Sequence, residues 1–132
     1  MRREFRLPEG DEEHLNGCQL SWETIIEAGT RWLIIHDYPI PTGYNLRAAS
    51  AALRVTPSYP DGGLDMVYFH PHLALVSGLT IKALTPHPLE GRQWQQWSRH
   101  RTPQNPWRSG VDDISTHLLL VDDWLSRELN RS

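Results

Sequence analysis

Apolar residues concentrate in three short stretches of the chain that are bounded by proline, glycine and asparagine. The first, residues 30 to 40, contains a β-branched apolar run and ends at two prolines, which predicts a strand. Residues 51 to 57, with Leu53 and Val55 on one face and Arg54 on the other, predict a second strand, and residues 64 to 69 predict a third. Because turn residues join the three stretches, we expect an antiparallel meander.

Helical periodicity marks the C-terminal part of the chain. Residues 109 to 129 place apolar side chains at spacings of three and four, which is typical of one helix face. The apolar stripe consists of Val111, Ile114, Leu118, Val121, Leu125 and Leu129. Ser109 and Asp112 fit a capping-box variant at its start. A shorter helix, interrupted near Asn16-Gly17, is expected within residues 11 to 29.

The segment from residue 71 to residue 108 shows no sustained period and contains several X-Pro steps. A loop of this length in a compact domain is usually functional or disordered. Its four rings argue against disorder, since disordered segments are poor in aromatic residues. These rings are Trp94, Trp97, His100 and Trp107. The order of elements predicts an α+β fold, one domain over residues 1–132, with helices on one face of an antiparallel sheet.

Charge and cysteine content narrow the class of protein. The chain has 13 Lys and Arg against 16 Asp and Glu, a formal net charge of −3. This balance lacks the basic patch that nucleic acid requires, so no nucleic-acid partner is expected. No apolar run approaches the length of a membrane span. The single cysteine, Cys18, excludes an internal disulfide and a multi-cysteine metal site, and we expect a cytoplasmic protein without a signal peptide.

The phrase at residues 56 to 71, "TPSYPDGGLDMVYFHP", resembles the centre of the ubiquitin-conjugating (E2) fold. In that family a Tyr-Pro turn leads into a strand that ends in His-Pro-Asn, and the catalytic cysteine follows. Tyr59-Pro60 matches the turn, and His70-Pro71 matches two residues of the tripeptide. Trp97-Ser98 resembles the later Trp-Ser step.

A closer resemblance is to prokaryotic E2 family E, and it covers nearly the whole chain. It lies in "LPEGDEEHLNG", "PxPxGYN", "WQQWSRH" and "GVDDISTHLLLVDDWL". The resemblance implies an E2/UBC-like antiparallel meander sheet with an N-terminal helix and a C-terminal amphipathic helix, and no cofactor. It also implies an E1-like activating enzyme, a ubiquitin-like protein (often in tandem copies) and a metalloprotease-type deconjugase as partners, in a setting of antiphage defence.

The sequence departs from the E2 pattern at two points. His72 stands where eukaryotic E2s have the asparagine that stabilises the oxyanion, and no cysteine follows it. Counting forward the usual eight residues from His72 reaches Thr80, whereas counting back from Trp97 reaches Leu89. The two counts disagree, so the family carries an insertion here.

An acyl group could be held on a hydroxyl instead of a thiol if a histidine removes the hydroxyl proton. The candidate hydroxyls are Ser77, Thr80 and Thr85, and the candidate bases are His70, His72, His87 and His100. Arginines on either side of His100 would lower its pKa and favour a neutral base. Ordinary loop hydroxyls and a histidine that only orders its loop are the alternative interpretation.

Three hypotheses therefore stand beside one another. The chain is an E2-like transferase that accepts the ubiquitin-like protein through a Ser/Thr oxyester, or a non-catalytic E2-variant-like module that binds E1 or the ubiquitin-like protein. The third is a metal-dependent hydrolase that uses His70 and His72 as ligands. Cys18 precedes the first strand and is expected to be a small, half-buried, packed residue.

Overall fold

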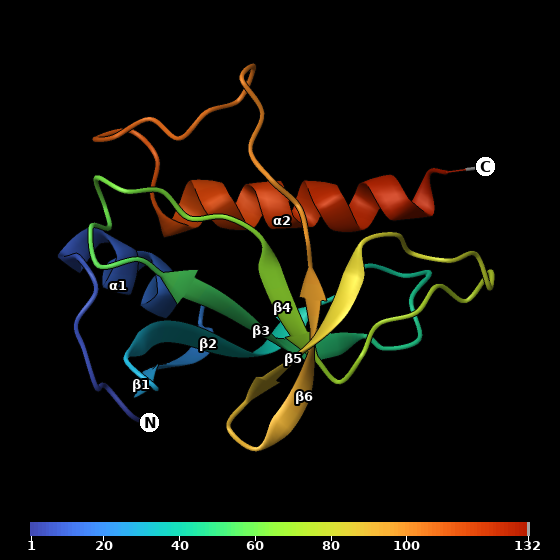
Figure 1. The fold of residues 1–132 in the computed structure, drawn as a ribbon, viewed down its shortest axis with the longest axis horizontal. Helices are drawn as coiled ribbons and strands as arrows, with labels where there is room; N and C mark the ends of the chain where they lie inside the picture. Colours follow the sequence, from blue (N-terminus) through green and yellow to red (C-terminus); the bar gives the residue numbers. More distant parts are fainter. Residues whose placement is uncertain (132) are drawn as a thin grey trace.

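The structure, a computed structural model, describes residues 1–131 and folds them into a six-stranded sheet and two helices (Figure 1). In chain order the elements are α1 (Glu9–Gly17), β1 (Ser21–Glu27), β2 (Thr30–Pro39), β3 (Ala48–Val55), β4 (Val67–His70), β5 (Leu84–Leu89), β6 (Arg92–Trp97) and α2 (Ile114–Leu129). No helix among these residues is both long and apolar enough to cross a bilayer.

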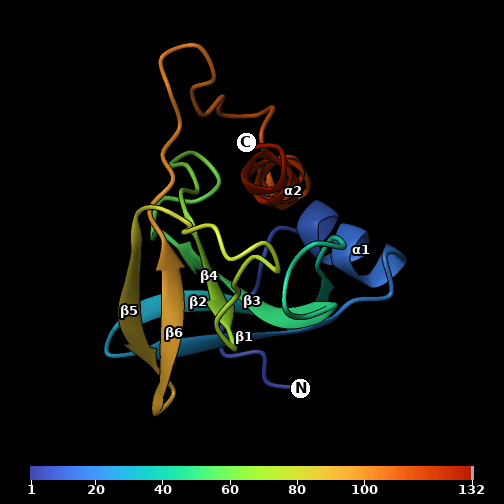
Figure 2. The same cartoon turned by 90° about the vertical axis from the view of Figure 1, so that its right-hand side faces the viewer.

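The sheet is antiparallel throughout, with strand order β1-β2-β3-β4-β6-β5. The first four strands form a meander, and β5 and β6 add a hairpin in which β5 is the edge strand. Both helices lie on the same side of the sheet (Figure 2). The predicted α+β arrangement, with helices on one face of an antiparallel meander, is confirmed.

The two faces of the sheet bury different apolar clusters, because alternate residues of a strand point to opposite faces. The face beneath the helices forms the larger core, with Leu33, Ile35, Leu53, Phe69 and Trp97 almost fully buried. The opposite face, which we call the outer face, carries a smaller cluster that includes Trp32, Ile34, Tyr68, Leu89 and Trp94. Residues of β5 and β6 therefore pack with residues of β2, so the sheet curves strongly.

Two of the connections between strands of this curved sheet are tight two-residue hairpin turns. Ala28-Gly29 joins β1 to β2, and Glu90-Gly91 joins β5 to β6, with positive φ at all four residues. Positive φ at both central positions is the geometry of a type I′ turn, which matches the twist of antiparallel strands. The two turns meet, because the Glu90 N–H donates to the Glu27 carboxylate at 3.0 Å.

The predictions were wrong in two regions. The helix expected within residues 11 to 29 is interrupted near Asn16-Gly17 as predicted, but strand β1, whose Thr, Ile and Trp side chains favour a strand, follows it and was not predicted. Residues 71 to 108 are not irregular throughout, since β5 and β6 lie within them. Pro86 and Pro88 were read as breaks, but an edge strand tolerates proline because one side of it has no hydrogen-bonding neighbour.

The C-terminal helix begins later than its apolar stripe predicts. It starts at Ile114, and Asp113 is the N-cap instead of Ser109. The Asp113 side chain accepts from the Thr116 N–H at 3.1 Å, and the Thr116 hydroxyl accepts from the Asp113 N–H at 3.0 Å. This reciprocal pair is a capping box, formed four residues beyond the one expected.

Candidate functional site

The segment that follows β4 and the His-Pro-His tripeptide is fastened to the sheet by one buried amide. Gln95 of β6 accepts from the Leu73 N–H at 3.0 Å and donates to the Leu73 carbonyl at 2.9 Å. The Trp97 indole N–H donates to the same Gln95 oxygen at 2.9 Å, which fixes the orientation of the amide. The "WQQWSRH" phrase thus holds the backbone directly after the tripeptide.

The turn after β2 holds the next residues of the same segment. The Asn45 amide oxygen accepts from the Ala74 N–H at 2.8 Å, and its Nδ2 donates to the His72 carbonyl at 3.1 Å. The Val76 N–H donates to the Gly43 carbonyl at 2.9 Å. The "PxPxGYN" phrase is therefore a second clamp, and residues 72–76 lie between two sets of fixed contacts.

Beyond the clamps, the chain exposes two of the three predicted hydroxyls, Ser77 and Thr80, whereas Thr85 lies in β5. The Ser77 hydroxyl accepts from the Leu79 N–H at 3.3 Å, and the Thr80 carbonyl accepts from Arg131 at 2.7 Å. Val76 is 74% exposed and Leu79 is 50% exposed, so large apolar side chains flank both hydroxyls. In residues 1–131 no hydrogen bond joins either hydroxyl to a histidine.

The predicted histidines are spread over the molecule, and one of the four, His87, lies in β5 with its ring centroid 5.0 Å from that of Tyr68. His70 ends β4 on the outer face, with its ring centroid 5.5 Å from that of Trp94, and His72 is exposed on the clamped segment. The buried His70 Nδ1 has no hydrogen-bond partner among the described residues. His100 lies instead on the loop after β6, where its Nδ1 pairs with Asp65 at 2.7 Å.

The arginines that flank His100 in the sequence bind other groups. Arg99 donates to Glu128 at 3.0 Å, and Arg101 donates to the Nδ1 of His117 at 2.9 Å. An acidic residue, Asp65, is thus the charged partner of His100 in the structure, which the sequence did not indicate.

The two-histidine metal site lacks further ligands. Nowhere in residues 1–131 do three or more His, Cys, Asp or Glu side chains form a group able to hold a metal ion. His70 and His72 therefore have no acidic or cysteine side chain to complete a coordination sphere in the described chain.

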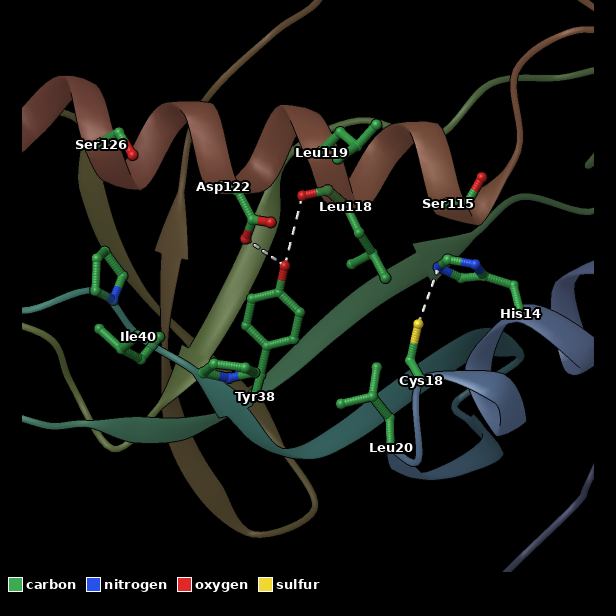
Figure 3. A pocket seen from close by; sticks show the side chains of 12 residues that line it. His14, Cys18, Leu20, Tyr38, Ile40, Ser115, Leu118, Leu119, Asp122 and Ser126 are labelled. Carbon is green, nitrogen blue, oxygen red and sulfur yellow. Dashed lines mark hydrogen bonds between the residues drawn. The ribbon is translucent and has the colours of Figure 1, made fainter.

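A separate cavity of about 710 Å³ opens between α1, the end of β2 and α2 (Figure 3). Its lining is mostly apolar, and Tyr38 crosses it to donate to the Asp122 carboxylate at 2.5 Å. Burial raises the pKa of Asp122 and that of Tyr38. Cys18 lines the cavity with its sulfur 3.7 Å from His14 Nε2. Cys18 is exposed, so its expected half-buried packing is wrong.

Helix α1, which precedes Cys18, and the exposed hydroxyls Ser77 and Thr80 lie toward different ends of α2. Asp11 of α1 accepts from the Ile114 N–H at the start of α2, whereas Arg131 beyond its end contacts Thr80. The same separation of α1 from the segment after β4 is visible in Figure 1. Cys18 is therefore not brought to the position where an E2 cysteine was sought.

Comparison with known protein families identifies the family of this chain. A model of prokaryotic E2 family E matches residues 7–128. The chain belongs to this family. No curated protein and no solved structure matched the chain. Family E membership makes it an E2-like protein of a prokaryotic ubiquitin-like conjugation system, and it implies an E1-like enzyme and a ubiquitin-like protein as partners.

The family E motifs thus have a structural meaning that the sequence alone did not supply. Two of them clamp residues 72–76, and a third caps and begins α2. Sequence reasoning missed His117, a fully buried histidine that joins α2 to Met66 and Arg101. The pattern of apolar positions gave no signal for it, because a polar residue in a buried stripe is identified only by its partners.

Proposed function

We propose that this chain accepts the ubiquitin-like protein from the E1-like enzyme and carries it as an oxyester on Thr80 or Ser77. The observation that supports this is the clamped segment 72–76, which is followed by two exposed hydroxyls flanked by exposed Val76 and Leu79. A rigidly held backbone beside exposed apolar side chains is a suitable arrangement for a site at which a partner protein docks.

The transfer exchanges one acyl bond for another. The hydroxyl oxygen attacks the carbonyl carbon of the E1 thioester, the carbon–oxygen bond forms, and the carbon–sulfur bond breaks. A histidine takes the hydroxyl proton and returns it to the departing thiolate. His72, on the same exposed segment, is our first candidate for this base, followed by His100 and His70.

A non-catalytic binding module is the second candidate function. It is favoured by the absence of a cysteine after β4 and by the lack of any hydrogen bond between a histidine and Ser77 or Thr80. Such a module would hold the E1-like enzyme or the ubiquitin-like protein while another component carries the acyl group. In both cases a metalloprotease-type deconjugase and a role in antiphage defence, in the cytoplasm, belong to the proposed pathway.

One reconstitution separates these functions. The protein is incubated with the E1-like enzyme, ATP and the ubiquitin-like protein, and the adduct is treated with thiol, hydroxylamine or base. An adduct that resists thiol, is cleaved by hydroxylamine and disappears in Thr80→Ala or Ser77→Ala supports the oxyester. Ser58→Ala, an exposed hydroxyl on another loop, is the matched control.

Other outcomes point elsewhere. A thiol-sensitive adduct that is lost in Cys18→Ala would show that Cys18, in the cavity beside α1, carries the acyl group. A stable complex without any adduct supports the binding module. Loss of both the adduct and the complex contradicts the proposal.

A further inference from the structure

Three side chains from neighbouring strands form a connected polar chain on the outer face of the sheet. Glu23 lies on β1, His36 on β2 and Ser50 on β3. The His36 Nε2 is 2.6 Å from the Glu23 carboxylate, and its Nδ1 is 3.2 Å from the Ser50 hydroxyl oxygen. A carboxylate, an imidazole and a hydroxyl in this order have the relations of an orienting acid, a base and a nucleophile.

A β-bulge in β2 produces this alignment. Ile35 pairs with Ala51 and Tyr38 pairs with Ala49, so two residues of β2 face Ser50 alone. The second of these, Asp37, has a φ of 52°, an uncommon value for a residue other than glycine. Bulges re-aim side chains and are frequent beside functional sites. Here the bulge allows the imidazole to reach both neighbouring strands.

The charge of Glu23 fixes which imidazole nitrogen carries the proton. Arg2 donates to one Glu23 oxygen at 2.7 Å, and this contact lowers the pKa of the carboxyl to about 2 despite its burial. The ionised carboxylate can only accept, so His36 Nε2–H donates to the other oxygen. Nδ1 is then unprotonated in the neutral ring and accepts from the Ser50 hydroxyl, as a general base does.

A histidine whose Nδ1 makes no hydrogen bond within residues 1–131 lies on the other side of Ser50. His70 is the residue directly opposite Ser50 across the β3–β4 pair. Directly opposed residues have Cβ atoms about 4.5–5.5 Å apart, so the two side chains are neighbours. The His70 Nδ1 has no partner among the described residues. His36 retains 32% exposure of its side chain, so the group is open to solvent on one side.

We propose that Ser50 is an activated nucleophile that takes acyl groups from thioesters and activated esters. The Ser50 oxygen attacks the acyl carbon while its proton passes to His36 Nδ1. The carbon–oxygen bond forms, the bond to the leaving thiolate or alkoxide breaks, and His36 returns the proton to the leaving group. The product is an ester on Ser50. This activity requires neither an E1-like enzyme nor a ubiquitin-like protein, so it goes beyond the proposed function.

The test uses the purified full chain and p-nitrophenyl acetate, with the modified residue located by mass spectrometry of peptides. We expect acetylation of Ser50 that is abolished in Ser50→Ala. His36→Gln keeps a polar side chain but removes the base, and we expect the acetylation rate to fall by about 10²–10⁴-fold. Glu23→Gln should also slow the reaction, since an amide holds the imidazole in place less firmly.

Matched variants separate activation from ordinary surface reactivity and from unfolding. Ser21→Ala removes an exposed hydroxyl of the same sheet and should leave the rate unchanged. Ser50→Cys keeps a nucleophile and should restore acylation, now as a thiol-sensitive thioester, which shows that loss in Ser50→Ala is not a folding defect. The assay contains neither the E1-like enzyme nor the ubiquitin-like protein, so its outcome does not depend on the proposed carrier residues.

Two results overturn the proposal. One is acetylation spread over lysines and several hydroxyls, with Ser50 no more reactive than Ser21. The other is a Ser50 acetylation rate that is unchanged in His36→Gln, because a base that can be removed without effect is not a base. Either result leaves the polar chain as a structural contact between β1, β2 and β3.

Discussion

Mild acidification should destabilise this protein through one buried histidine. His117 of α2 has no exposed surface, accepts from Arg101 Nη2 at 2.9 Å and donates to the Met66 carbonyl at 2.9 Å. Burial is the main reason that its pKa falls to about 4, and the positive charge of Arg101 lowers it further. The hydrogen bond to the Met66 carbonyl raises the pKa of His117, but this effect is smaller than that of burial.

The pH range of the effect follows from the two protonation equilibria. In the unfolded chain His117 titrates near its ordinary pKa of 6.5, whereas in the folded protein the pKa is about 4. Between these values the unfolded state binds more protons, so the stabilisation is complete above 6.5 and is lost as the pH falls toward 4. Proton linkage gives a loss of about 2 kcal/mol between pH 7 and pH 5, and about 3 kcal/mol by pH 4.

Urea unfolding at several pH values between about 7 and 5, followed by tryptophan fluorescence, measures this loss. With a urea dependence of about 1–3 kcal/mol per M, the midpoint should fall by about 1 M over this range. His117→Gln keeps a donor and an acceptor but does not titrate, so its free energy of unfolding should depend less on pH. Glu23, with a pKa near 2, begins to lose its contribution only below this range.

The reasoning is refuted if wild type and His117→Gln show the same pH slope. A direct titration of the His117 ring signals by NMR gives a second check, and a midpoint near the ordinary value of 6.5 contradicts the assignment of a buried neutral imidazole.

Three further predictions concern stability, and each is measured by chemical denaturation at neutral pH. Asp113→Ala removes the N-cap of α2 and should cost about 1 kcal/mol, whereas Asp113→Asn should retain most of the cap. Gly43→Ala should cost about 1–3 kcal/mol, because Gly43 has a φ of 116° and an added Cβ meets Leu129; an unchanged midpoint contradicts the strain argument. Tyr59→Phe removes the hydroxyl that donates to the buried Asp11 carboxylate at 2.5 Å and should cost about 1–2 kcal/mol. Burial raises the pKa of Asp11, so the loss should shrink if a protonated Asp11 finds another partner at low pH.

Several features of the molecule followed from local patterns of sequence. Strand β2 was predicted at residues 30 to 40 and lies at Thr30–Pro39, because a β-branched apolar run between turn residues has few other stable conformations. The C-terminal helix was predicted to end at Leu129, as it does. The family was also identified from phrases that lie far apart in the chain, and the family match confirms it.

Other elements depended on their neighbours. Strand β5 forms although it contains Pro86 and Pro88, because it is an edge strand that pairs with β6 on one side only. Strand β1 was not predicted, since the periodicity of a short mixed segment does not distinguish strand from helix without the partner strand. Propensity is a weak prior, and pairing decided both cases.

The chemistry of the sites divides in the same way. The sequence determined which reactive side chains exist: no cysteine after β4, hydroxyls at Ser77 and Thr80, and many histidines. Only the tertiary structure decided their partners. It placed His100 beside Asp65, buried His117, and brought Ser50 and His36 together through a bulge. The physical reason is that hydrogen bonds and desolvation act over a few ångströms between residues far apart in the chain, and strand register sets those distances.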